Sequence, residues 1–119
     1  MVSSNTFSYK DGVLDKMRAL VGRSVCWVVL RIAEGGDSEC DMVDSGVTTG
    51  NDDQDFEAMA AVVPDDQPRW ILIDFHYEKG GVNNNKVVFI AYTPDACTKV
   101  SDKFAYANNK EKVKSQVTV

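Results

Sequence analysis

The sequence predicts an α/β (α+β) domain in which helices flank a central mixed β-sheet. Apolar residues recur at helical spacing near the start, in the middle and near the end of the chain, and three apolar, β-branched segments have the length of strands. The order helix, strands, helix, strand pair, helix does not alternate strictly, as βαβ units would. With 119 residues, 44% of them hydrophobic, the chain can close one core, so we expect a single domain over residues 1–119.

The first helix is expected to follow a polar segment, residues 1–7, with Ser8 as its cap. One face of this helix collects the apolar side chains Val13, Leu14, Met17, Leu20 and Val21. Gly22 is expected to end it. Residues 25–32 (VCWVVLRI) are apolar on both faces of a strand, which is typical of a central strand covered on two sides.

The segment 35–55 is rich in Gly, Asp, Ser and Thr, and only ECDMV (39–43) interrupts it. We expect one edge strand there, followed by a long acidic surface loop. Phe56, Met59, Ala60 and Val63 then recur at helical spacing up to Pro64, which lacks an amide donor. They predict a short second helix.

Two further apolar strands, residues 69–77 and 86–93, are separated by EKGGVNNN, whose Gly and Asn residues tolerate a turn. These strands predict a hairpin. Residues 98–116 contain helix formers and charges, and predict a longer final helix. Residues 117–119 could form only the stub of a strand.

The composition excludes several classes of protein. A net charge of −5 and a pI near 4.7 argue against nucleic-acid binding, which requires surplus Lys and Arg. No apolar run reaches the roughly 20 residues of a transmembrane segment, and the start lacks a basic then apolar signal, so we expect a soluble, unsecreted, cytoplasmic protein. The three cysteines, Cys26, Cys40 and Cys97, are widely and irregularly spaced, which favours reduced thiols.

No pattern indicates catalysis, a metal or another cofactor. The single histidine, His76, lies in an apolar strand pattern, and paired carboxylates such as Asp65 and Asp66 lie in polar turns. No Gly-rich segment fits a phosphate loop. We therefore expect a protein that is not an enzyme, although a cysteine-dependent enzyme using Cys97, or a regulatory fragment without activity, stays an alternative.

A stripe of lysines follows the predicted last helix. At about 100° per residue, Lys103, Lys110 and Lys114 fall within roughly 40° of one another, and Lys99 lies close to the same stripe. Such a stripe commonly does no more than keep a helix solvated. On an acidic chain, however, it also creates a dipolar surface suited to an acidic partner.

Three segments in order, PRWILIDFHY, KVVFIAYTPDA and KFAYANNKEKVK, resemble segments of the ADF/cofilin family. PRWILIDFHY resembles the family's R-Y-x-x-x-D-F strand, KVVFIAYTPDA its apolar strand ending in aromatic-x-P-D, and KFAYANNKEKVK its helix reading K-M-x-Y-A-S-S-K-D. The start MVSSNTF and the strand VCWVVLRI are also similar to the family's start and first strand. The resemblance covers nearly the whole chain and implies an ADF-homology (gelsolin-like) fold.

The resemblance implies a protein that binds actin monomers and filaments, promotes filament disassembly, and acts as a monomer in the cytoplasm on the actin cytoskeleton, without a cofactor. It assigns actin contact to matching positions, and with Lys99 of the stripe the set is Ser3, Ser4, Lys99, Lys103, Phe104, Asn108, Lys110, Glu111 and Lys114. Tyr106 is expected to pack inward. Lys79 and Lys86 match a second surface that contacts filaments only.

Two modes of regulation are also implied by the resemblance. Ser3 matches the position at which phosphorylation switches relatives off, because the added charge would repel acidic actin. Phosphoinositide head groups would compete with actin for the same lysines.

The chain also departs from the family pattern. Members continue past the long helix into another strand and a final helix, so we expect a C-terminally short fold and weak severing. Asn108 and Asn109 stand where the family has two serines. The spacing from Pro94 to Phe104 and the DQPR preceding the first hairpin strand resemble glia maturation factor, so the alternative is a regulator of branched actin nucleation that removes branches.

Overall fold

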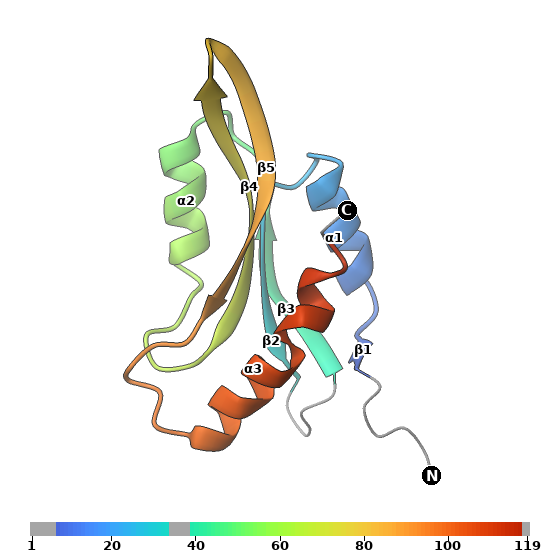
Figure 1. Cartoon of the computed structure of the whole chain (residues 1–119), viewed down its shortest axis with the longest axis vertical. Helices are drawn as coiled ribbons and strands as arrows, with labels where there is room; N and C mark the ends of the chain where they lie inside the picture. Colours follow the sequence, from blue (N-terminus) through green and yellow to red (C-terminus); the bar gives the residue numbers. More distant parts are fainter. Residues whose placement is uncertain (1–6, 34–38, 118–119) are drawn as a thin grey trace.

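The computed structural model describes residues 7–33 and 39–117. These residues form three helices and one sheet of five strands, and Figure 1 shows helices on both faces of the sheet. In chain order the elements are β1 (Ser8–Tyr9), α1 (Val13–Val21), β2 (Trp27–Ile32), β3 (Glu39–Gly46), α2 (Asp52–Ala60), β4 (Arg69–Lys79), β5 (Val82–Tyr92) and α3 (Val100–Lys114).

The sheet is mixed, as predicted, with the strand order β1-β3-β2-β4-β5. The short strand β1 runs parallel to β3, and the other neighbours are antiparallel. β2 is a central strand between β3 and β4, because its side chains are apolar on both faces. At its start Trp27 lies opposite Gly46, where a Cβ atom would overlap the indole ring.

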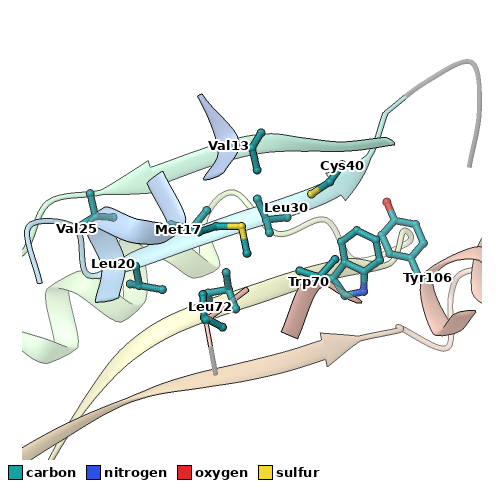
Figure 2. Close-up of a cluster of buried hydrophobic side chains, with 12 residues drawn as sticks. Val13, Met17, Leu20, Val25, Leu30, Cys40, Trp70, Leu72 and Tyr106 are labelled. Atoms are coloured by element: carbon teal, nitrogen blue, oxygen red, sulfur yellow. The ribbon is translucent and has the colours of Figure 1, made fainter. Parts of the chain in front are cut away.

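The larger core lies on the face of the sheet that α1 and α3 cover (Figure 2). Its side chains alternate along the strands with those of the opposite face, as the twofold period of a strand requires. The cluster comprises Val13, Met17, Leu20, Val25, Val28, Leu30, Cys40, Trp70, Leu72, Tyr106, Val113 and Val117.

A smaller core lies on the opposite face, beneath α2 (Figure 1). Trp27, Val29 and Ile71 of the sheet pack there with Met59 of α2 and with Cys26. α2 begins at Asn51, whose side-chain oxygen accepts a hydrogen bond from the Gln54 amide at 3.0 Å. This is the arrangement of a helix N-cap.

The prediction that Ser8 caps the first helix is wrong. Gly12 occupies the N-cap position without a side-chain hydrogen bond, and Ser8 lies in β1 opposite Glu39. Phe7 and Tyr9 pack against the larger core, and this burial holds the segment as a strand. The predicted end of the helix at Gly22 is confirmed.

The strand predicted at 39–43 forms and extends to Gly46. It is not at the edge of the sheet along its first residues, because β1 pairs there with Glu39 and Cys40.

The long acidic loop was predicted to extend to Asp55, and this prediction is wrong, because residues from Asp52 onward belong to α2. The prediction that Phe56 lies on the apolar face of this helix is wrong, because Phe56 is 58% exposed. Met59 is buried, as its place on the predicted face implies, and it shares the buried side of α2 with Asp55, because α2 starts earlier than predicted.

The hairpin is confirmed, but its turn is tighter than expected. Gly80 and Gly81 alone form the turn, with φ of 62° and 81°, a conformation that suits glycine. The asparagines 83–85 belong to β5, which runs antiparallel to β4 over its whole length. Val117 lies in a turn after α3 and not in a strand stub, and residues 118–119 lie outside the described residues.

Candidate functional site

The last helix, α3, is fixed by two side chains on its inner side. Tyr106 and Val113 are buried, and the Tyr106 hydroxyl accepts a hydrogen bond from the Ile32 amide at 2.9 Å. The rings of Tyr106 and Trp70 lie 4.8 Å apart between centroids (Figure 2). The inward packing expected of Tyr106 is confirmed, and it determines which residues of α3 face outward.

The outer face of α3 presents Phe104, Asn108 and Glu111. At about 100° per residue, Phe104 lies roughly 160° from Tyr106, and Asn108 and Glu111 lie within roughly 40° of Phe104. The Phe104 side chain is 63% exposed. An isolated apolar ring between polar neighbours is therefore available to a partner.

The lysines lie along one flank of α3, beside its buried side. Because α3 is one uninterrupted helix, Lys103, Lys110 and Lys114 are aligned roughly 40–80° from Tyr106. Lys103 is half-buried, and Lys110 and Lys114 are exposed. Lys99 is the N-cap residue, at the start of the same flank. The cations and Phe104 thus occupy neighbouring faces of one helix.

A groove of about 610 Å³ adjoins the start of α3. It is lined by residues that include Arg69, Cys97 and Lys99. The guanidinium of Arg69 donates to the Pro68 carbonyl at 2.7 Å and to the Gln67 amide oxygen at 3.1 Å. Cys97 is buried, and its thiol points to the Lys99 carbonyl at 3.9 Å.

The other two thiols are poor nucleophiles. Burial raises the pKa of Cys26 to about 11 and that of Cys40 to about 12, so both stay protonated at neutral pH. Within residues 7–33 and 39–117, no group of three His, Cys, Asp or Glu side chains could hold a metal ion. Among the helices of these residues, none is a candidate for spanning a bilayer.

The candidate filament contacts, Lys79 and Lys86, lie on the hairpin. Lys79 ends β4, and Lys86 lies in β5 opposite Phe75. Because side chains alternate along a strand, both lysines share a face of the hairpin with Phe75 and Tyr77. Ser3 and Ser4 lie outside the described residues.

The sequence model of the cofilin/tropomyosin-type actin-binding protein family matches residues 6–119. The chain belongs to this family. The cofilin of Cryptococcus neoformans is 27% identical over 87% of this chain and 72% of its own length. Actin-depolymerizing factor 2 of Arabidopsis thaliana is 33% identical over 57% of this chain and 50% of its own length.

A solved structure supports the fold of this family member. Actin depolymerization factor 2 of Plasmodium berghei superposes with a TM-score of 0.80, covering 99% of this chain and 82% of the other, at 18% identity. The ADF-homology fold expected from the resemblance is confirmed.

The two carboxylates beside His76 were not predicted from the sequence. The ring is exposed, and its Nδ1 lies 2.9 Å from Asp52 of α2 while its Nε2 lies 3.3 Å from Asp74 of β4. The i, i+2 spacing of Asp74 and His76 on one strand was a signal for part of this cluster. Asp52 is 24 residues away in sequence, and only the packing of α2 brings it near.

Proposed function

We propose that this family member binds actin monomers and filaments through α3 and promotes filament disassembly. The observation that carries the proposal is the exposed Phe104 ring, flanked by Asn108 and Glu111, on a helix whose inner side is fixed in the core. Rigid aromatic side chains at the centre of a contact typically provide much of its binding energy. The names of the relatives support the same function.

The lysine flank would guide the encounter. Lys103, Lys110 and Lys114 concentrate positive charge on a chain whose net charge is −5. Such a patch raises the rate of association with an acidic partner and fixes its orientation. Lys99, Ser3 and Ser4 extend the proposed monomer contact, and the lysines would equally attract anionic phosphoinositide head groups.

The remaining parts of the proposal concern filaments and regulation. Lys79 and Lys86 would contact the filament only, from the hairpin. Phosphorylation of Ser3 would weaken binding by adding negative charge. The protein would act as a monomer in the cytoplasm, on the actin cytoskeleton, by contact alone and without a cofactor or catalysis.

The double charge reversal K103E K110E tests the proposal. We expect it to weaken binding to actin monomers, and co-sedimentation with filaments, by roughly tenfold or more, because it replaces attraction with repulsion. The control K10E K16E changes the net charge equally at exposed lysines on and before α1. Equal affinity for the wild type and K103E K110E would refute the proposal.

A debranching assay on branched actin networks, run beside the binding assay, tests the alternative of a glia maturation factor-like regulator. Branch removal without binding to actin itself would favour that alternative.

A further inference from the structure

A second groove, of about 220 Å³, lies between α2 and β4 on the face of the sheet opposite α3. We call it the α2 groove. Its floor is apolar, formed by Trp27, Met59 and Ile73. The side chains of Phe56 from α2 and Phe75 from β4 form its walls.

These two aromatic side chains are unusually accessible for their size. Phe56 is 58% exposed and Phe75 is 50% exposed, although both line an apolar depression. The Phe75 ring continues into that of Tyr77, with centroids 6.3 Å apart and planes at 16°. Exposed aromatic side chains around an apolar depression are characteristic of a protein-binding surface.

The rim of the α2 groove is acidic. Asp52 and Asp53 are exposed in the first turn of α2, and Asp52 lies 2.9 Å from Nδ1 of His76, which also lines the groove. Asp55 and Asp74 also line the groove, but Asp55 accepts hydrogen bonds from Thr49 and Asp74 accepts one from Asn85. The lining residues include no Lys or Arg. Lys86, opposite Phe75 in the β4–β5 ladder, is not one of them.

We propose that the α2 groove binds a basic, apolar segment of a partner protein. An aliphatic or aromatic side chain of that segment inserts between Phe56 and Phe75, and a neighbouring Lys or Arg faces Asp53. The acidic rim complements a basic ligand and repels anionic lipids, nucleic acids and a second copy of this acidic chain. Since α3 covers the opposite face of the sheet, such a partner would leave the proposed α3 contact with actin monomers open. It would lie on the same face of the hairpin as Lys79 and Lys86, the proposed filament contacts.

A pair of fluorescein-labelled peptides tests the proposal on the full chain. Both peptides have the same length and the same Leu and Phe content, but one carries Arg and Lys where the other carries Glu and Asp. Fluorescence anisotropy should show saturable binding of the basic peptide, weaker at high salt, and no binding of the acidic one.

Variants locate the binding site. F56S F75S should raise the Kd of the basic peptide by at least about tenfold, because it removes both walls of the groove. F104S removes an equally exposed Phe from α3 and should leave the Kd unchanged. K103E K110E should also retain peptide binding, so that failure of the proposed actin contact and failure of this site are distinguishable. A urea midpoint for each variant verifies that it is folded.

Three results would overturn the proposal. The first is a basic peptide that binds no better than the acidic one, and the second is F56S F75S binding it as well as F104S does. The third is a dimer of the wild type, seen in sedimentation, that F56S F75S dissociates, which would assign the groove to a second copy of the chain.

Discussion

His76 joins two elements through a single side chain. Its ring lies between the carboxylates of Asp52 at the start of α2 and Asp74 in β4. Asp74 is only 8% exposed, and it also accepts a hydrogen bond of 2.7 Å from Asn85 of β5. A protonated imidazole can donate to both carboxylates at once, whereas a neutral ring has only one donor.

This geometry predicts a pH-dependent contribution to stability. The hydrogen bond to Asp52 raises the pKa of His76 above its ordinary value near 6.5; partial burial opposes the rise, and Asp74 reinforces it. Because the folded pKa is raised, the stabilisation is complete below about pH 6.5 and is lost as the pH rises through the raised pKa. The stability difference between wild type and H76Q, from urea unfolding, should therefore be larger near pH 5.5 than near pH 8.5.

The variant D15N is a suitable control, since Asp15 pairs with Arg18 on the surface of α1, away from His76. Its effect should not change with pH over this interval. A difference between wild type and H76Q that is constant or grows with pH would contradict the assignment.

At the scale of the element, α2 depends on its N-cap. Asn51 supplies the side-chain acceptor for the Gln54 amide, and Asp55 accepts from both the amide and the hydroxyl of Thr49, closing the turn that leads into the helix. The first turn also carries Asp52, Asp53 and Asp55, whose charges favour the positive end of the helix dipole.

Replacing the cap should loosen α2 and the wall of the α2 groove. We expect N51A to lower the free energy of unfolding by about 0.5–2 kcal/mol, the usual effect of removing an N-cap acceptor. Chemical denaturation measures the change. N108A, on the outer face of α3, is the matched control and should cost less; an equal loss in both variants would argue against the cap.

Within the molecule as a whole, two hydrogen bonds attach α3 to the sheet. Near the middle of α3 the Tyr106 hydroxyl accepts from the Ile32 amide of β2, and near its C-terminal end the Lys112 carbonyl accepts from the Tyr9 hydroxyl of β1 at 3.3 Å. The first hydrogen bond is part-buried and the second is exposed. The first should therefore matter more to stability.

The variant Y106F removes the acceptor of a part-buried backbone amide without changing the shape of the core. We expect it to lower the free energy of unfolding by about 1–3 kcal/mol, the cost of leaving such a donor unpaired. Y9F removes a longer, solvent-exposed hydrogen bond and should cost less. The order of the two urea midpoints is the test, and a greater loss in Y9F would contradict the inference.

Elements whose patterns are local could be predicted from the order of the amino acids alone. The apolar run of β2 predicts a central strand, and the spacing of Val13, Met17 and Leu20 predicts the buried face of α1. The apolar segments on either side of Gly80–Gly81 predict the hairpin. All three are confirmed, because period and turn chemistry depend on neighbouring residues. The inward Tyr106 and the outward Phe104 were likewise predictable, from a resemblance that assigned both positions.

Other features depend on how the elements pack together. Ser8 lies in a strand because its neighbours Phe7 and Tyr9 pack against residues that are distant in the chain. Phe56 faces outward because α2 starts directly after its N-cap residue, Asn51. The meeting of Asp52, Asp74 and His76, and with it the acidic rim of the α2 groove, depends on how α2 packs over the sheet. Contacts between residues far apart in the chain leave no local period, so no pattern in the sequence could reveal them.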